Sequence, residues 1–472
     1  MFEQLKKKLK EFGQEHLLAF WDELSNGEKE ELALQIEAID FVYMDELIKH
    51  YVLQVPEAKI SNNLKPAPYF SLTPKDEAQA QLLKKAFAKG EELLRNGKVA
   101  ALTVAGGQGT RLGFDGPKGT YPITPIKKKT LFQYFAESIG RVGRKYGSEM
   151  SWHIMTSQLN DKSTRDFFEE NNFFGLNPSK VSFFMQGTMP CFGYDGKILL
   201  ASKSSLALAP DGHGGTLLAL RKSGSLDQMK SEGVEYISYF QVDNPLASVA
   251  DPLFIGLHCL ENSEMSARML PKTGPYEKLG NFCVSDGKLE IIEYSDMPKE
   301  LADAKNEDGS LLFLAGSPAI HVISRDFVER LTAAGHLNMP WHRADKRVDF
   351  MDENGVSVVP EEINAVKLES FIFDALPLAG HTSVLEARRE EEFAPTKNPT
   401  GVDSVESCRA MLIARDAERM EKAGVEVPRK ADNSPDCVIE LSPAVIIDDQ
   451  DAVEYAKTHQ IKISRGEELC VE

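Results

Sequence analysis

Short apolar runs alternate with amphipathic stretches along the middle of this 472-residue chain. The apolar runs predict buried strands over residues 99–104, 151–156, 181–186, 234–242, 264–270, 288–294, 310–323 and 369–376. Apolar residues at helical spacing lie between several of them, over 131–142, 162–170 and 216–222. This alternation is typical of a mainly parallel central sheet covered by helices on both faces. We therefore predict an α/β, Rossmann-like domain over residues 98–380.

The segments on either side of this domain have different patterns. Residues 1–97 are charged and mostly helical, with a helix expected to begin at an N-cap on Thr73 and to run to about Leu94. This N-terminal region is either a helical cover for the main domain or a lid or partner surface. Residues 381–472 combine a strand expected at 383–389 with a helix expected at 406–423, which predicts a small C-terminal α+β domain.

Composition narrows the function classes. The chain is 42% hydrophobic and 27% charged, and its net charge of −18 argues against non-specific nucleic-acid binding. No apolar run approaches the ~18 residues of a membrane span. The six cysteines form no CxxC pair, which indicates neither a zinc site nor a disulfide framework and favours the reducing cytoplasm. We expect no nucleic-acid or membrane partner, and we infer no protein partner.

A glycine-rich stretch with two cations, AGGQGTRLGFDGPKGTYP, follows the strand predicted at 99–104. Gly106, Gly107, Gly109 and Gly113 permit positive φ angles and a close approach of backbone amides to anionic oxygens. Arg111 and Lys118 add positive charge. The spacing fits neither the P-loop nor the dinucleotide fingerprint. The loop is either a tight structural turn or, as we predict, a polyphosphate site.

Polar residues also follow two other predicted strands, where ligands of parallel sheets bind. Gln186 ends a very apolar strand. Its amide is either satisfied by backbone or pairs with the edge of a base. Asp243 ends the strand YISYFQVD and is either a turn residue in Asp-Asn-Pro or a ligand of Mg²⁺ (or Mn²⁺). Asp251 is expected to cap a helix that begins at Pro252.

The motif GGxGTRLG with a following PKG resembles the UDP-sugar pyrophosphorylase family of nucleotidyltransferases, and most closely its UDP-N-acetylhexosamine branch. Further segments resemble the family in the same order over roughly residues 95–400. They are QGTMPCFGYDGKILL (186–200), LAPDGHGG (208–215), VDNPLASVADPLFIG (242–256), IIEYSD (291–296), ESFIFD (369–374) and EEEFAPTKN (390–398).

The resemblance implies that UTP and a sugar 1-phosphate, preferentially N-acetylglucosamine 1-phosphate, give a UDP-sugar and pyrophosphate. It implies that the loop from Ala105 to Gly109 embraces the nucleotide, that Arg111 meets the pyrophosphate and that Lys118 and Lys397 hold phosphates. It further implies that Gln186 reads uracil, that Gly212 lets the backbone approach the base and that Asp243, supported by Asn244, binds the metal. The residues that it places around the sugar are Gly280, Glu293, Tyr294, Phe371 and Phe373. The two phenylalanines, spaced i and i+2 on an expected strand, face one side and either line an acetamido pocket or pack in the core.

Two residues depart from the branch pattern. His213 replaces a usual asparagine and is either a substrate-binding residue or a solvated loop histidine, and Ile320 replaces an asparagine before His321. These departures leave open a UDP-glucose or broad-specificity UDP-sugar pyrophosphorylase. A non-catalytic nucleotide-sugar-binding protein is the other alternative, and the presence of Arg111, Lys118, Asp243 and Lys397 together counts against it.

Overall fold

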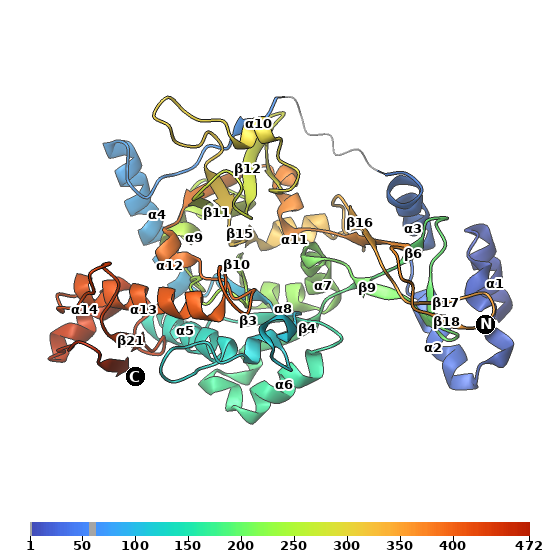
Figure 1. The fold of residues 1–472 in the computed structure, drawn as a ribbon, viewed down its shortest axis with the longest axis horizontal. Helices are drawn as coiled ribbons and strands as arrows, with labels where there is room; N and C mark the ends of the chain where they lie inside the picture. Colours follow the sequence, from blue (N-terminus) through green and yellow to red (C-terminus); the bar gives the residue numbers. More distant parts are fainter. Residues whose placement is uncertain (1, 56–62) are drawn as a thin grey trace. The chain divides into compact units, whose positions relative to one another are not determined.

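A computed structural model describes residues 2–55 and 63–472 of the chain (Figure 1). The chain divides into two compact units, each assembled from segments that are distant in sequence. The smaller unit comprises Met1–Ile60, Gln186–Thr216 and Leu337–Asp374, and the larger unit comprises Ser61–Met185, Leu217–His336 and Ala375–Glu472. The domain boundaries predicted after residues 97 and 380 stay predictions, because this grouping does not show which segment folds alone.

The larger unit is an α/β structure built on one large sheet. Among the described residues this sheet has 11 strands, in the order β1-β12-β14-β11-β15-β10-β2-β3-β4, with β13 beside β12 and β20 beside β11. Pairing is parallel from β10 through β2 and β3 to β4 and between β11 and β20, and it is antiparallel elsewhere. The sheet is therefore mixed, and the expected parallel character is confined to these strands. The hairpin from β12 to β13 turns through Asp286 and Gly287, both at positive φ, and so short a turn requires antiparallel pairing.

The elements of the larger unit have these bounds. Its strands are β1 (Lys65–Pro66), β2 (Val99–Val104), β3 (Trp152–Thr156), β4 (Val181–Met185), β10 (Tyr236–Gln241), β11 (Met265–Pro271), β12 (Gly280–Ser285), β13 (Lys288–Ile292), β14 (Ala315–Ser317), β15 (His321–Ser324), β20 (Thr382–Glu386), β21 (Val438–Leu441) and β22 (Glu468–Val471). Its helices are α4 (Glu77–Arg95), α5 (Leu131–Tyr146), α6 (Asp161–Glu170), α7 (Thr216–Lys222), α8 (Ser225–Ser231), α9 (Pro252–Leu260), α10 (Lys299–Ala302), α11 (Arg325–Leu331), α12 (Arg389–Glu392), α13 (Val405–Lys422) and α14 (Asp449–Thr458).

Aromatic packing fixes the helices that flank β3. Phe132 of α5, Trp152 of β3 and Phe168 of α6 are fully buried, and their rings meet edge to face with centroids 5.1–6.3 Å apart. Edge-to-face pairs of this kind stabilise a core beyond the area they bury. On α4 and α9, a side chain at Gly90 or Gly256 would collide with backbone of the facing helix. Glycine is therefore required for this close helix packing.

The smaller unit joins the N-terminal helices α1 (Phe2–Glu11), α2 (Asn26–Glu37) and α3 (Phe41–Leu47) to short antiparallel strands. These strands are β5 (Thr188–Pro190), β6 (Phe192–Gly193), β7 (Leu200–Ser202), β8 (Ser205–Leu206), β9 (Leu208–Pro210), β16 (His342–Lys346), β17 (Phe350–Met351), β18 (Ser357–Val358) and β19 (Ala365–Glu369). Its core combines Leu9, Trp21 and Ile36 with Phe192 and Leu368. The N-terminal helices thus share a core with segments that lie far along the chain.

Several predicted elements differ from those observed. The single strand predicted at 310–323 is the two strands β14 and β15, and the strand predicted at 369–376 is wrong. Strand β19 ends at Glu369, and the 3₁₀ helix η9 (Ile372–Leu378) follows, because the Asp374 carboxylate accepts a hydrogen bond from the Phe371 amide (3.1 Å) and turns the chain. Helix α4 is capped by Asp76, whose carboxylate accepts from the Gln79 amide, rather than by Thr73.

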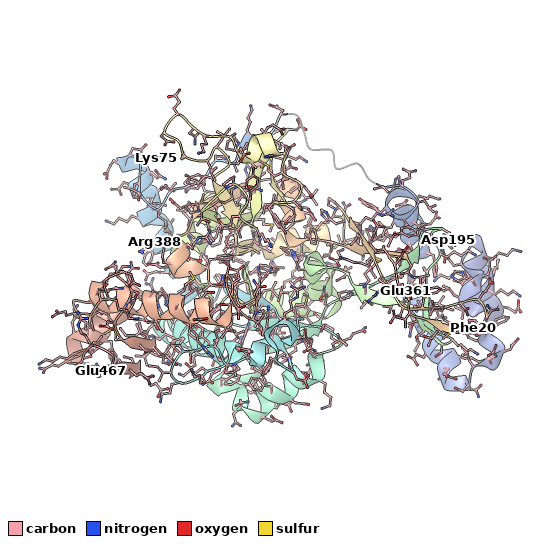
Figure 2. The ribbon with its side chains drawn as sticks, in the orientation of Figure 1. Phe20, Lys75, Asp195, Glu361, Arg388 and Glu467 are labelled. Carbon is pink, nitrogen blue, oxygen red and sulfur yellow. The ribbon has the colours of Figure 1, made fainter. Side chains whose placement is uncertain are left out.

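Charge lies on the surface of both units. Lys75, Asp195 and Glu361 are exposed (Figure 2). All six cysteines are free thiols. Within residues 2–55 and 63–472, no helix combines the length and the apolar character needed to cross a membrane.

Two buried histidines are expected to make the larger unit sensitive to acid. Burial lowers the pKa of His258 to about 3 and that of His153 to about 4. Because an unfolded histidine titrates near pH 6.5, protonation of the unfolded chain destabilises the native state as the pH falls below that value. Each histidine is expected to remove ~1.4 kcal/mol from the free energy of unfolding per pH unit, down to its folded pKa.

Urea unfolding between about pH 7 and pH 4.5, on the wild type and on His258→Gln, tests this expectation. Glutamine can still bond Ser266 and Ser324, the hydroxyl partners of His258, without taking up a proton. The variant should lose stability less steeply with falling pH. The same slope in both proteins would contradict the assignment of His258.

Candidate functional site

The glycine loop leaves the carboxyl end of β2 in the larger unit, and its carbonyls are bonded to protein. The buried Asn160 side chain donates to the carbonyls of Ala105 (2.9 Å) and Gly107 (3.3 Å). Ser157 Oγ donates to the Gly106 carbonyl (2.8 Å). The amides of Gly106, Gly107 and Gln108, in contrast, donate no hydrogen bond to any described residue. A run of unengaged amides can donate hydrogen bonds to an anion.

The glycines of this loop serve different purposes. A Cβ at Gly107 would meet no protein atom within 4 Å, so protein packing alone does not require glycine there. At Gly109 a Cβ would lie 2.7 Å from the Phe114 ring. The expectation of positive φ is confirmed at Gly113 (φ 68°) and wrong at Gly106, Gly107 and Gly109, and Gly116 (φ 149°) supplies the other positive angle. The loop turns at its far end, and its first glycines keep ordinary backbone angles.

Two cations of the loop lie in different surroundings. Arg111 is exposed on the short 3₁₀ helix η4 (Thr110–Leu112) and forms no ion pair with any residue in the described ranges. Lys118 Nζ lies 3.1 Å from Asp243 Oδ2, and the two side chains are only 16% and 12% exposed. A largely buried ion pair therefore joins the far end of the glycine loop to the segment that follows β10, the parallel neighbour of β2.

The end of β10 also holds the segment that carries Lys397. Asn244 Nδ2 donates to the Glu392 carbonyl (2.7 Å), and Asn244 Oδ1 accepts from the Ala394 amide (2.9 Å). The Thr396 amide and hydroxyl both donate to the Asp243 carbonyl (2.9 and 3.1 Å). Asn244 is 4% exposed, so its amide positions the chain that leads to the exposed Lys397.

Asp403 is a neighbour of this group that sequence reasoning missed. Its backbone carbonyl accepts from the Lys397 amide (2.6 Å). Burial raises the pKa of the Asp403 carboxyl, and the charge of Lys397 opposes this shift while that of Asp243 reinforces it. Both charges thus act on the same carboxyl. No motif or spacing in the sequence marks Asp403.

The donor set at Asp243 limits the metal that it could hold. Within residues 2–55 and 63–472, no three histidine, cysteine or carboxylate side chains are grouped as metal ligands. Magnesium characteristically binds through one or two carboxylates together with substrate phosphates and water. A single carboxylate paired with a lysine of the glycine loop fits such a phosphate-dependent Mg²⁺ site and does not fit a structural zinc site.

The smaller unit brings Gln186 and Gly212 together. Gln186 Nε2 donates to the Gly212 carbonyl (2.9 Å), which leaves the amide oxygen of Gln186 as an acceptor. Gly212 has φ 84°, and a side chain there would collide with the backbone of Ser370. Glycine is thus already required by the contact with Ser370. The prediction that Gly212 approaches a base stays a prediction.

His213 is not a solvated loop histidine. Its Nδ1 accepts a hydrogen bond from the Ile372 amide (3.1 Å), which places any single ring proton on Nε2. Its ring stacks on Phe371 with centroids 5.3 Å apart and lies 5.8 Å from Phe373. Phe371 and Phe373 remain neighbours, at 5.2 Å, although they lie at the start of η9 and not on a strand.

His342 and Asp374 also belong to this group, and sequence reasoning did not identify either as a site residue. His342 stacks on Phe371 with centroids 4.3 Å apart, and its Nε2 lies 2.8 Å from Asp374 Oδ2. The Asp374 carboxylate also holds the Phe371 amide. His342 lies on β16, far from every sequence motif, so only the fold reveals it.

The remaining candidate sugar residues lie in the larger unit. Gly280 opens β12 and Glu293 follows β13, so the β12–β13 hairpin places the Glu293 carboxylate 3.6 Å from the position of a Cβ on Gly280. Tyr294 is 43% exposed. Ile320, which stands where the family usually has asparagine, is 4% exposed and belongs to the main core.

Lys272 is a further residue that sequence reasoning missed. It is 6% exposed, and burial lowers its pKa. Its Nζ donates to Asn281, the neighbour of Gly280. Buried lysines with shifted pKa values are frequent in functional sites.

Comparison with known proteins identifies the family. The family model described as UTP–glucose-1-phosphate uridylyltransferase matches residues 45–445. UDP-N-acetylglucosamine diphosphorylase 1 of Arabidopsis thaliana is 36% identical over 87% of this chain and 82% of its own. UDP-N-acetylhexosamine pyrophosphorylase-like protein 1 of Homo sapiens is 34% identical over 94% of this chain and 92% of its own. The crystal structure of the UDP-N-acetylglucosamine pyrophosphorylase from Trypanosoma brucei superposes with a TM-score of 0.77 at 27% identity, covering 96% of this chain and 94% of that one. The chain belongs to the UTP–glucose-1-phosphate uridylyltransferase family.

Proposed function

We propose that this chain transfers uridylyl from UTP to a sugar 1-phosphate, preferentially N-acetylglucosamine 1-phosphate, giving a UDP-sugar and pyrophosphate. The names of the full-length relatives support this sugar. The observation that carries the proposal is the run of unengaged loop amides after β2, in the same loop as Arg111 and the Lys118 of the Lys118–Asp243 pair. Although the protein is acidic, with a net charge of −18, hydrogen-bond donors and cations lie together in this loop.

The reaction that this loop would catalyse needs charge neutralisation more than proton transfer. A sugar-phosphate oxygen, already an anion, attacks the α-phosphorus of UTP in line, and pyrophosphate departs. No protein base is required, so catalysis is positioning and electrostatic stabilisation. The loop amides would hold the polyphosphate, and Arg111, which forms no ion pair with a described residue, would neutralise charge that develops on the leaving pyrophosphate.

Lys118 and Lys397 would hold the α-phosphate and the sugar phosphate. Asn244 and Thr396 position the chain that leads to Lys397. Asp243 would hold Mg²⁺ (or Mn²⁺), which neutralises phosphate charge when bound.

Recognition of base and sugar is assigned to two further groups. The Gln186 oxygen, which is left as an acceptor, would accept a hydrogen bond from the N3–H of uracil. Phe371 and Phe373, braced by His213, would give an acetamido methyl an apolar wall. Glu293 and Tyr294 would bond sugar hydroxyls. We also propose a cytoplasmic location, on the six free cysteines, and helices on both faces of the central sheet, as in other α/β folds.

Pyrophosphate release with a panel of substrates tests the proposed function. UTP should be used far better than ATP or GTP, and N-acetylglucosamine 1-phosphate should be used best, with detectable use of N-acetylgalactosamine 1-phosphate. An apolar wall for one methyl group favours the N-acetylated sugar over glucose 1-phosphate by roughly 10–200-fold in kcat/KM.

Two outcomes would overturn parts of this assignment. A tenfold preference for glucose 1-phosphate would make the chain a UDP-glucose pyrophosphorylase. Tight binding of UDP-sugars without turnover of any substrate would make it a nucleotide-sugar-binding protein. Arg111→Ala is the matched negative control for background pyrophosphate release.

A further inference from the structure

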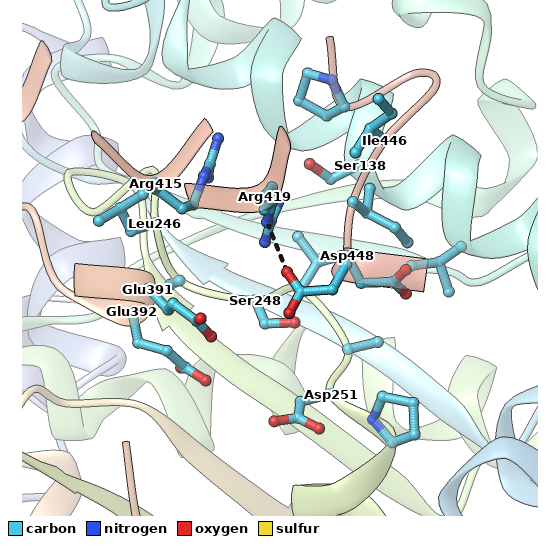
Figure 3. Close-up of a pocket in the computed structure, with 18 of the residues that line it drawn as sticks. Ser138, Leu246, Ser248, Asp251, Glu391, Glu392, Arg415, Arg419, Ile446 and Asp448 are labelled. Carbon is cyan, nitrogen blue, oxygen red and sulfur yellow. Dashed lines mark ion pairs between the residues drawn. The ribbon is translucent and has the colours of Figure 1, made fainter. Parts of the chain in front are cut away.

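A cavity of about 330 Å³ lies in the larger unit (Figure 3). Its walls come from α5, α13 and α14 and from residues 245–252, which link β10 to α9. Arg415, Arg419 and Ser138 contribute polar atoms, whereas Leu246 and Ile446 contribute apolar surface (Figure 3). No residue of the glycine loop lines it. A cavity of this volume is at the lower end of the range of small-molecule sites, ~300–1,000 Å³.

The carboxylates that line the cavity form ion pairs with cations that lie outside it. Glu391 pairs with Lys422 (3.0 Å) and Arg388 (2.9 Å). Asp449 pairs with Lys422 (2.8 Å). The remaining lining carboxylates are paired in the same way: Glu392 and Asp251 with Arg268, and Asp448 with Lys145. Each lining carboxylate is therefore within ion-pair distance of a cation outside the cavity, although Arg268 and Lys422 are each shared between two of them.

The two arginines of the cavity differ in how close a carboxylate lies to each guanidinium. Arg415 forms a close ion pair with Asp416 (2.5 Å). Arg419 has only a long pair with Asp449, at 3.9 Å, and its buried Nε has no hydrogen-bond partner among the described residues. The Arg419 side chain is 14% exposed. Burial, reinforced by the charge of Arg415, lowers the pKa of Arg419.

Burying a guanidinium without a close anion costs free energy unless a ligand supplies the negative charge. Arginine binds phosphate through paired, charge-assisted hydrogen bonds. We propose that this cavity is a binding site for a phosphate group, free or carried on a small organic molecule, with Arg419 as its principal ligand. The apolar surface of Leu246 and Ile446 would contact the organic part of a small molecule that carries the phosphate. The proposal concerns binding alone and does not depend on the proposed reaction.

Calorimetric titration of the full chain with inorganic phosphate, at an ionic strength matched with sodium chloride, tests this site. Arg419→Gln should weaken phosphate binding at the cavity by about tenfold or more, because a charge-assisted pair is lost. Asp449→Asn should strengthen it several-fold, because the competing carboxylate is neutralised. Arg111→Gln, which alters the glycine loop, should leave this binding event in place.

The variants give opposite expected shifts, so misfolding cannot imitate the result. If Arg419→Gln does not fold, Asp449→Asn decides, since that side chain is 47% exposed. Unchanged phosphate affinity in Asp449→Asn, or loss of all phosphate binding in Arg111→Gln, would overturn the proposal. Glycerol 3-phosphate distinguishes the two sources of phosphate: tighter binding than inorganic phosphate indicates an esterified ligand, and equal binding indicates the free ion.

Discussion

Arg111→Ala is expected to lower kcat by ~10²–10³, the range for losing one charge stabiliser from an active site. The guanidinium is exposed and forms no ion pair with a described residue, so its positive charge is available to a ligand. Because it contributes no core packing, the free energy of unfolding should change little. Steady-state pyrophosphate release and urea unfolding on the same preparations separate the two effects.

The matched control for this variant is Arg95→Ala. Arg95 is a surface arginine at the end of α4, 54% exposed and paired with Glu91 one turn earlier. Surface pairs of this kind contribute little to stability. The control should keep wild-type kcat. Wild-type turnover in Arg111→Ala would remove that residue from the catalytic group, whereas an equal loss of kcat in both variants would show a general effect of lost surface charge.

Local sequence patterns were reliable where one physical cause dominates. The apolar run at 99–104 is β2 to the residue, and Asp251 caps α9 at Pro252 as predicted. The glycine loop and Gln186 come directly after strands, and Asp243 lies two residues beyond the end of β10. Strand ends depend on local hydrophobicity and turn chemistry, so sequence alone places them well.

Predictions failed where contacts between residues far apart in sequence determine the local structure. The strand expected at 369–376 breaks because Asp374, held by His342, bonds the Phe371 amide. Gly212 is required by the backbone of Ser370, more than 150 residues away in sequence. His213 braces Phe371 and Phe373 through a partner that the sequence places equally far away. Likewise, a parallel and a mixed sheet have the same apolar runs, because the pattern does not record strand direction.

Asp243→Asn and Lys118→Met are expected to move the Mg²⁺ requirement in opposite directions. In the proposed site Asp243 binds the metal, and Lys118, whose Nζ lies 3.1 Å from its carboxylate, is its ion-pair partner. An amide is a poorer ligand for a hard cation, so Asp243→Asn should raise the Mg²⁺ concentration for half-maximal activity by ~10–100-fold. Lys118→Met should lower that concentration, because no ammonium competes for the carboxylate, while kcat still falls by ~10²–10³.

The alternative for this pair is a purely structural ion pair that joins the glycine loop to the segment that follows β10. Both side chains are largely buried, so removing either charge would then leave the other uncompensated and lower stability. In that case the two variants would unfold more easily by similar amounts and share the wild-type Mg²⁺ profile. Activity titrations with Mg²⁺ and with Mn²⁺, read beside urea unfolding, distinguish the two roles. Opposite shifts of the metal requirement would arise only if Lys118 and the metal compete for the same carboxylate. Loss of a purely structural pair would not change the Mg²⁺ concentration needed for half-maximal activity.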